Sequence, residues 1–361
     1  MNLNCEDYIL YIRKEMKEKK KYDEYVHALK AYRQYLEKRL LHEPNDIEAV
    51  CQYSAILQEL RYSKKECAEP MEKALVRKSD SLIPFDKLRL HTNLAGIYES
   101  GEKCVKHLQK AVQLNLPVPH AYDALGRVYI LKKEYQLAVP LFKKAAQLSK
   151  RAVYQYNYAV SLYQSCEVEL AKNLLESLLP STDQEILYAY AVCCHFTGNG
   201  DQAAAILDVL AGTTTENSRV SKYELADLYF LCGKYREHNA MIDGANFPPA
   251  RECSWVYPYL YALKQQDEMQ RLKQKYCEFL QEIEEDRAYI EDESLDADFS
   301  QEDKDNYMAK YQQEARALQE FYTKLLRLDF VPVKTITLYC KDECYMLDCP
   351  RHQYVIGHID L

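Results

Sequence analysis

The sequence predicts an all-α fold, a right-handed superhelix of stacked helical hairpins, and three observations lead to this prediction. Apolar and small residues recur in paired helical patterns at a period of 31 to 35 residues. The 361 residues include only 9 glycines, so tight turns are few, and 32 tyrosines, which suit helix interfaces that stay wet at one end. No strand-like run occurs before about residue 331. An irregular helical bundle is the alternative, but four consecutive units in register are hard to obtain by chance.

The clearest unit runs from Pro119 to Lys150 and contains two short patterns. They are Tyr122-x2-Leu125-Gly126-x2-Tyr129 in the first helix and Ala138-x3-Phe142-x2-Ala145 in the second. Two antiparallel helices cannot bury their apolar faces alone, so large residues must return in each repeat to build a continuous core. We expect Phe142 to fill the gap between neighbouring hairpins. Gly126 costs about 1 kcal/mol in helix propensity, and it is tolerated because a larger side chain would block the approach of the helices.

The neighbouring units repeat the same residue types. The sets in register are Cys104, Leu108 and Ala111; Ala171, Leu175 and Leu178; and Ala203, Leu207 and Leu210. These patterns resemble the tetratricopeptide repeat family over about residues 1 to 265, most clearly in residues 119–150. The resemblance implies a helical solenoid that binds other polypeptides. The Lys, Asn and Arg clamp by which some family members bind chaperone C-termini is absent at the aligned positions of this chain.

The domain organisation follows from these patterns. We expect an irregular N-terminal helix pair in residues 1–46, repeats in 47–265, long helices with an acidic linker at 283–305 in residues 266–330, and a small β module in 331–361. The N-terminal pair should consist of helices at Cys5–Glu18 and Tyr22–Leu41. Tyr259 to Tyr289 is predicted to form one long helix, or a pair that is broken near Gln265 to Asp267.

Two features predict the end of the chain. Ser300 followed by Asp303 indicates a helix N-cap, so the last helix should begin at Gln301, end near Leu328 and cover the final repeat. Residues 331–339 then alternate between apolar and polar, and two shorter apolar runs follow at 344–347 and 353–359. We predict a small antiparallel β-meander, packed on the preceding helix because three strands need a further surface to be stable.

Composition restricts the partners and the compartment. The net charge of −8 disfavours a nucleic acid or an anionic membrane as a partner. The first ten residues lack the basic and apolar layout of a signal peptide, and no apolar run reaches 18 residues, so no membrane association is expected. The 13 cysteines are scattered, mostly on apolar helix faces, which predicts reduced core cysteines in a cytoplasmic protein.

The sequence contains no constellation for catalysis. It has no glycine-rich phosphate loop, no nucleophile elbow and no His-x3-His pair, so we expect neither an enzyme nor a bound cofactor. The one metal candidate is Cys340, Cys344, Cys349 and His352, which lie within thirteen residues. Three thiolates and an imidazole can hold zinc, but the spacings differ from the usual paired C-x2-C knuckles. Core cysteines on a small sheet are the other interpretation.

The binding residues are expected on the concave face, which the first helix of each repeat lines. Positions there that the repeat packing does not use are Arg89, Thr92, His120, Asp123, Arg127, Tyr154, Asn157, Ser161, Gln164 and Phe196. Arginine and asparagine at this face would suit an extended peptide backbone or a partner helix. Ordinary solvent exposure is the alternative for each single residue, and Arg127 in particular is expected to be exposed.

Three classes of function remain open on the sequence alone. The first is a non-catalytic adaptor that binds another protein or a peptide in the concave groove. The second is a peptide-responsive regulator of the bacterial sensor type, although residues 1–46 are too short for a DNA-binding module with its linker. The third is a zinc-binding or enzymatic role of the C-terminal module.

Overall fold

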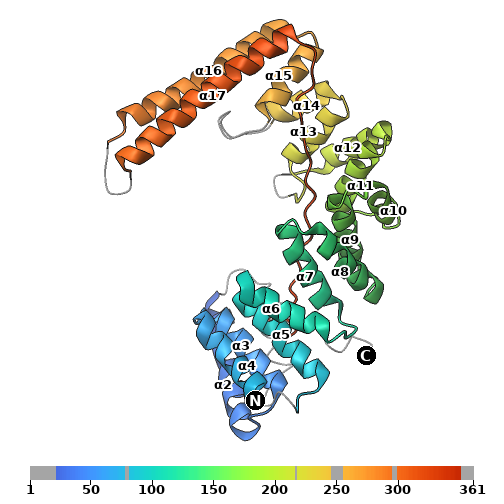
Figure 1. Ribbon diagram of the computed structural model, residues 1–361, viewed down its shortest axis with the longest axis vertical. Helices are drawn as coiled ribbons and strands as arrows, with labels where there is room; N and C mark the ends of the chain where they lie inside the picture. Colours follow the sequence, from blue (N-terminus) through green and yellow to red (C-terminus); the bar gives the residue numbers. More distant parts are fainter. Residues whose placement is uncertain (1–21, 78–80, 216–217, 245–254, 295–298, 351–361) are drawn as a thin grey trace. The chain divides into compact units, whose positions relative to one another are not determined.

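The computed structural model describes residues 22–77, 81–215, 218–244, 255–294 and 299–350. Within these ranges the chain forms sixteen α-helices and no strand (Figure 1). The helices are α2 (Tyr22–His42), α3 (Ile47–Glu59), α4 (Lys64–Arg77), α5 (Pro84–Tyr98), α6 (Gly101–Gln113), α7 (Pro119–Leu131), α8 (Tyr135–Leu148), α9 (Ala152–Gln164), α10 (Val168–Glu176), α11 (Gln184–Phe196), α12 (Gly200–Thr213), α13 (Lys222–Leu231), α14 (Tyr235–Asp243), α15 (Val256–Gln265), α16 (Met269–Asp292) and α17 (Gln301–Arg327). The predicted all-α architecture of helical hairpins is therefore confirmed.

The chain divides into two compact units, which are described separately. Unit 1 contains residues 1–167 together with residues 339–361, and unit 2 contains residues 168–338. Residues 339–350 thus belong to the N-terminal unit, although more than 170 residues separate them from residue 167 in sequence. A sequence pattern that is read locally cannot predict such a return.

Unit 1 is an array of packed hairpins in which helices adjacent in sequence contact one another, from α2 and α3 through α8 and α9. Phe142 of α8 is fully buried, and its ring lies against Gly126 of α7. A Cβ atom on Gly126 would lie 2.9 Å from two ring carbons of Phe142, closer than real Cβ contacts allow. The predicted roles of both residues in the close approach of α7 and α8 are therefore confirmed.

Unit 2 continues the hairpin pattern and ends in the two longest helices. The helices α16 and α17, of 24 and 27 residues, lie side by side (Figure 1). Tyr276 of α16 stacks on Tyr322 of α17 with ring centroids 3.8 Å apart. Ser300 caps α17 in a capping box with Asp303, as predicted. Leu325 of α17 belongs to the same buried cluster as residues of α13 and α15, so this helix covers the final hairpin.

The predicted β-meander is wrong over the residues that the structure describes. Residues 331–346 have neither helix nor strand, and a turn follows at residues 347–348. The segment is nevertheless extended, because residues 331–338 alternate in exposure, with Val333 at 92% and Leu338 at 3%. The extended chain contacts helix side chains rather than neighbouring strands. Within unit 2, Lys334 pairs with Asp227 of α13, and within unit 1, Lys341 bonds to Asn157 of α9. The run at 353–359 and the helix at Cys5–Glu18 lie outside the described residues.

The helix boundaries elsewhere follow the predicted patterns. The predicted break near Gln265 is present, since α15 ends there and α16 begins at Met269. Helix α2 begins at Tyr22, as expected for the second N-terminal helix. No helix in the described parts of the chain is long and apolar enough to cross a membrane.

Candidate functional site: the surface of unit 1 that contacts residues 339–350

The C-terminal segment, residues 339–350, lies on side chains of α5, α7 and α9 within unit 1. We call the side chains that contact it the segment-binding surface: Arg89 and Asn93 of α5, Arg127 of α7, and Asn157 of α9, with Arg151 just before α9. The segment has no helix or strand of its own before residue 347, and Figure 1 draws it as a thin dark red chain. Its contacts therefore come from the surface beneath it.

Asn157 recognises the backbone of the segment. Its Nδ2 donates to the carbonyl of Lys341 at 3.1 Å, and its Oδ1 accepts from the amide of the same residue at 2.7 Å. Asn157 is fully buried, and its Nδ2 also donates to Oδ1 of Asp123 at 2.8 Å. Because only backbone atoms of Lys341 take part, this pair of bonds does not depend on the identity of the bound residue. The Lys341 ammonium lies 5.1 Å from the ring of Tyr156.

Two arginines bind the acidic residues of the segment. Arg127 donates to the carboxylate of Asp342 and, at 2.6 Å, to the backbone carbonyl of Glu343. Arg151 donates to the side chain of Glu343. The guanidinium of Arg127 also lies 5.7 Å from the ring of Tyr345. Arginine suits these contacts better than lysine does. Its planar guanidinium can donate to a carbonyl and a carboxylate at once, and it can also lie against an aromatic ring.

The far end of the segment is held by a buried aspartate. Nε of Arg89 donates to the two carboxylate oxygens of Asp348 at 2.9 and 3.2 Å, and Nδ2 of Asn93 donates to one of them at 2.7 Å. The Oδ1 of Asn93 accepts from the amide of Asp348 at 3.3 Å. Asp348 is 1% exposed, and burial raises the pKa of its carboxyl, while Arg89 and Asn93 act in the opposite direction. An asparagine thus pairs with the segment's backbone near both ends.

Between the acidic residues and Asp348, three consecutive apolar side chains enter three different clusters. Tyr345 packs on the cluster of α5, α6 and α7, Met346 on the cluster of α3, α4 and α5, and Leu347 on the cluster that joins α5 to α7. Gly96 of α5 makes room for Met346, because a Cβ there would lie 2.2 Å from Cγ of Met346. The apolar run is therefore buried residue by residue against the hairpins.

The charged groups of the segment-binding surface also hold one another. Arg89 donates to Glu48 of α3 at 3.0 Å, and Nε of Arg127 donates to Asp123 of the same helix at 3.0 Å. Burial raises the pKa of Asp123, and the neighbouring Arg127 and Asn157 oppose that rise. The surface therefore keeps Arg89, Arg127 and Asn157 in place through contacts that do not involve residues 339–350.

The structure assigns different surroundings to the ten predicted binding residues. Arg89, Arg127 and Asn157 contact the segment, and Asp123 holds two of these side chains in place. Contrary to the expectation, Arg127 is not exposed, since its side chain is only 13% exposed and is paired on several sides. Asp123 is four residues away, but the sequence could not show the contacts with the Asp342 carboxylate and the Glu343 carbonyl, which are 215 and 216 residues away.

The other predicted binding residues have varied surroundings. Thr92 and Ser161 donate to backbone carbonyls of their own helices, which uses their hydroxyl protons. His120 packs edge-on against Tyr154 with centroids 6.0 Å apart. Gln164 ends α9, and Phe196 ends α11 in unit 2, where it is 44% exposed and lies edge-on to His195.

Sequence reasoning missed Asn93, Arg151 and Glu48. Asn93 lies 64 residues before Asn157, which is two repeats of 32, and this spacing was the available signal. Thr92, one residue before Asn93, matches Asp123 at a spacing of 31, so the repeat register points to Thr92 instead. Arg151 precedes its helix and Glu48 lies near the start of α3, so neither follows the register of the repeat.

The thiols of Cys344 and Cys349 lie within hydrogen-bond range of each other. Among the described residues, no group of three or more His, Cys, Asp or Glu side chains is placed to hold a metal ion. Cys340, Cys344 and Cys349 are all described, whereas His352 lies outside the described residues. Burial raises the pKa of the Cys340 thiol, which favours the uncharged form rather than a metal-binding thiolate. A site that includes His352 stays a prediction.

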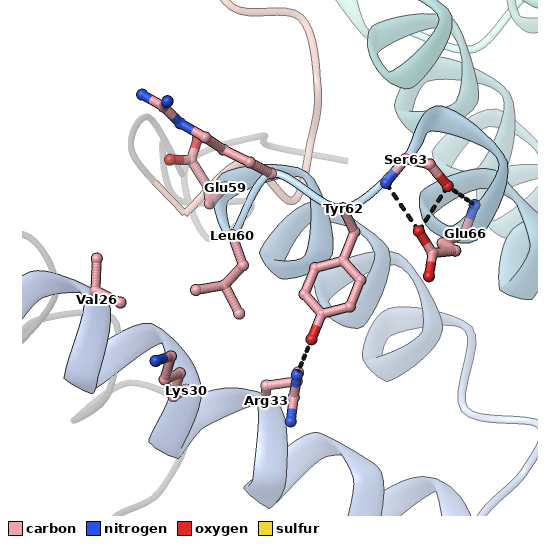
Figure 2. A pocket seen from close by; sticks show the side chains of 9 residues that line it. Val26, Lys30, Arg33, Glu59, Leu60, Tyr62, Ser63 and Glu66 are labelled. Carbon is pink, nitrogen blue, oxygen red and sulfur yellow. Dashed lines mark hydrogen bonds between the residues drawn. The ribbon is translucent and has the colours of Figure 1, made fainter.

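A separate cavity of about 560 Å³ lies between α2 and the turn from α3 to α4 (Figure 2). Its lining includes Lys30, Arg33 and Arg61 together with two acidic residues. Arg33 donates to the hydroxyl of Tyr62 and lies 5.8 Å from that ring, and Ser63 bonds to Glu66 across the helix start. Figure 2 shows the Arg33 side chain and the Tyr62 hydroxyl pointing toward one another and joined by this hydrogen bond. None of the predicted binding residues lines it.

The chain is similar to several solved structures. YrrB, described as a TPR protein with an unusual peptide-binding site, aligns with a TM-score of 0.43 and 14% identity over 56% of this chain and 97% of that chain. Yeast Tom70 aligns at 0.41 and 14% over 89% of this chain and 65% of that one. A tetratricopeptide repeat protein from Parabacteroides merdae aligns at 0.41 and 15% over 74% and 96%. No family model matches the sequence, and no curated protein matches it. The solved structures that the chain is similar to are tetratricopeptide repeat proteins, which is the family that its sequence resembles.

Proposed function

We propose that this chain is a protein-interaction scaffold, and that unit 1 binds an extended polypeptide on the segment-binding surface. The observation that carries the proposal is the pair of hydrogen bonds between the side chain of Asn157 and the backbone of Lys341. A side-chain amide that pairs with both polar groups of one peptide unit recognises an extended chain as such.

The charge of the surface supports an acidic partner. Three arginines, Arg89, Arg127 and Arg151, face residues 339–350, although the whole chain has a net charge of −8. Charge-assisted bonds from arginine to carboxylate are among the strong hydrogen bonds of proteins, and partly buried ones are screened little by salt. We infer that a partner segment carries carboxylates at the positions that Asp342, Glu343 and Asp348 now occupy.

The test is a pull-down from the native host with the full chain and with the double variant Arg127→Glu and Asn157→Ala. The variant removes the backbone-recognising amide and reverses one charge of the surface, so partner recovery should fall by about tenfold or more. Because both residues are packed in unit 1, bait must be matched by folded concentration from circular dichroism. The control is Arg236→Glu, a charge reversal at an exposed position of α14 in unit 2. Equal recovery with the double variant and the control would reject the proposal.

A further inference from the structure

We propose that residues 339–350 are an intramolecular mimic of the partner, so that the partner presents the same order of side chains and binds by displacing this segment. The order is an acidic pair, a spacer, one aromatic and two apolar residues, and then an aspartate. This inference rests on the proposed function, because it specifies what the segment-binding surface recognises and what it must release.

Different groups of the segment-binding surface contact each position in that order. Arg127 and Arg151 lie at the acidic pair, three separate apolar clusters take Tyr345, Met346 and Leu347, and Arg89 with Asn93 enclose the aspartate. Selectivity should be greatest at the aspartate. The side chain of Asp348 is 0% exposed and bonded to both partners, whereas that of Asp342 is 92% exposed. An exposed ion pair contributes little, and a buried one that loses a partner is strongly destabilised.

The segment-binding surface keeps its own internal bonds when residues 339–350 are displaced by a partner. When the segment leaves, Arg89 keeps its bond to Glu48, whose side chain is 44% exposed, and Arg127 and Asn157 keep their bonds to Asp123. Arg89, Arg127 and Asp123 therefore each keep an oppositely charged partner after the segment has left. A preorganised surface of this kind loses little freedom when it binds, which favours replacement of one segment by another.

The segment is held by side chains of the surface and by no strand ladder, so its release breaks no element of secondary structure. It is also tethered, because residues 328–338 connect it to α17. A tether gives an effective concentration in the millimolar range for a flexible linker, and a free peptide must overcome that advantage. Weakening the tethered copy should therefore increase the affinity for a free copy of the same sequence.

The experiment uses a fluorescent synthetic peptide with the sequence of residues 339–350 and the full-length chain. Fluorescence anisotropy should show at least tenfold tighter binding to the Asp348→Ala chain than to the unaltered chain, because the tethered competitor has lost its anchor. A second chain variant, Met346→Ala, weakens the competitor at a different contact and should act in the same direction. Adding Arg89→Ala to the Asp348→Ala chain should abolish the gain, because the free peptide then lacks its own anchor.

The matched peptide carries Asp348→Asn, which keeps the shape of the anchor and removes its charge. It should bind the Asp348→Ala chain at least tenfold more weakly than the natural peptide, whereas a peptide with Asp342→Asn should lose less. Folding of each chain variant is checked by circular dichroism. If neither Asp348→Ala nor Met346→Ala increases peptide affinity while both chains are folded, the mimicry is rejected.

Failure of the mimicry and failure of the proposed function give different results. A host partner that is lost with Arg127→Glu and Asn157→Ala, but is not displaced by excess 339–350 peptide, overturns the mimicry and leaves the proposed function standing. A host partner that survives those substitutions overturns the proposed function, even where the peptide binds the Asp348→Ala chain.

Discussion

The side-chain amide of Asn157 forms two hydrogen bonds with the backbone of Lys341, donating at 3.1 Å and accepting at 2.7 Å. The same Nδ2 donates to Asp123, which fixes the orientation of the amide because a carboxylate can only accept. Since Arg127 donates to the other oxygen of Asp123, one buried carboxylate orients two of the side chains that contact the segment. Asn157 and Arg127 therefore contact the segment in orientations that Asp123 fixes.

Replacing Asn157 tests this relationship directly. Asn157→Asp would place a second carboxylate beside Asp123 and remove the amide group that donates to the carbonyl of Lys341. We expect a loss of about 1–3 kcal/mol in stability, the usual range for buried polar groups left without a partner. Amide hydrogen exchange of residues 341–343 should accelerate at the same time. Asn306→Asp, at an exposed position of α17, is the control and should change neither quantity noticeably.

Gly96→Ala tests whether Met346 anchors the segment. The new Cβ would lie 2.2 Å from Cγ and 2.4 Å from Sδ of Met346, so this side chain must move. Faster hydrogen exchange over residues 345–349 is the expected result. The matched control is Gly212→Ala in α12, where a Cβ meets nothing within 4 Å, and which should stabilise by up to about 0.5–1 kcal/mol.

A double variant makes the same test specific. Adding Met346→Ala to Gly96→Ala removes the colliding atoms, so the second substitution should cost less than it does in the natural chain. Additive losses would mean that Gly96 and Met346 do not compete for the same space.

The hairpin packing could be predicted from the sequence, and the site only in part. Gly126 and Phe142 repeat a local pattern, and the structure places them in contact for the reason that the pattern gave. Ser300 and Asp303 also act within one turn of helix. Arg127 and Asn157 could be identified as residues left over from packing, but what they contact depends on residues 184 to 216 positions away.

The extended segment shows why the remainder could not be predicted. The alternating exposure of residues 331–338 indicates that the backbone is extended. The pattern does not indicate whether a strand or a helix lies beside it. We predicted neighbouring strands, whereas Lys334 pairs with Asp227 of α13 at 2.7 Å, and Asn157 of α9 bonds to Lys341. Helix side chains can bury one face of an extended chain as a sheet does, so periodicity cannot separate the two.

Phe142→Ala should be among the most destabilising single substitutions in unit 1. The side chain is fully buried between α7 and α8, and Phe→Ala in a core costs about 3–5 kcal/mol. Gly126→Ala should also destabilise the natural chain, since its Cβ would lie 2.9 Å from the ring. In the Phe142→Ala background that contact is gone, and Gly126→Ala should become neutral or stabilise by up to about 1 kcal/mol through helix propensity. Urea unfolding of the four chains measures the cycle, and an equal cost of Gly126→Ala in both backgrounds would show that the ring is not the obstacle.

The last prediction concerns pH and His238 in unit 2. His238 is fully buried, and its Nδ1 lies 2.8 Å from the carbonyl of Ala226, so Nδ1 carries the proton and donates. Its Nε2 has no partner among the described residues. Burial, with a smaller contribution from Lys334, lowers the pKa of His238 to about 4, while the Ala226 carbonyl and Asp243 oppose the change.

Between pH 6.5 and about 4 the unfolded chain therefore binds a proton at His238 that the folded chain does not bind. Stability must fall as the pH drops through this window, and at one unit below the unfolded pKa the loss is about 1.4 kcal/mol for this group. Urea unfolding at pH 7.5 and 5.5 should show that His238→Gln, which can still donate to Ala226 but does not titrate, loses less stability than the natural chain over this step. His91 and His120, whose pKa values burial also lowers to about 4, contribute equally to both chains, so only the difference reports on His238. An identical loss in the two chains would mean that His238 is protonated, or accessible to water, in the folded state.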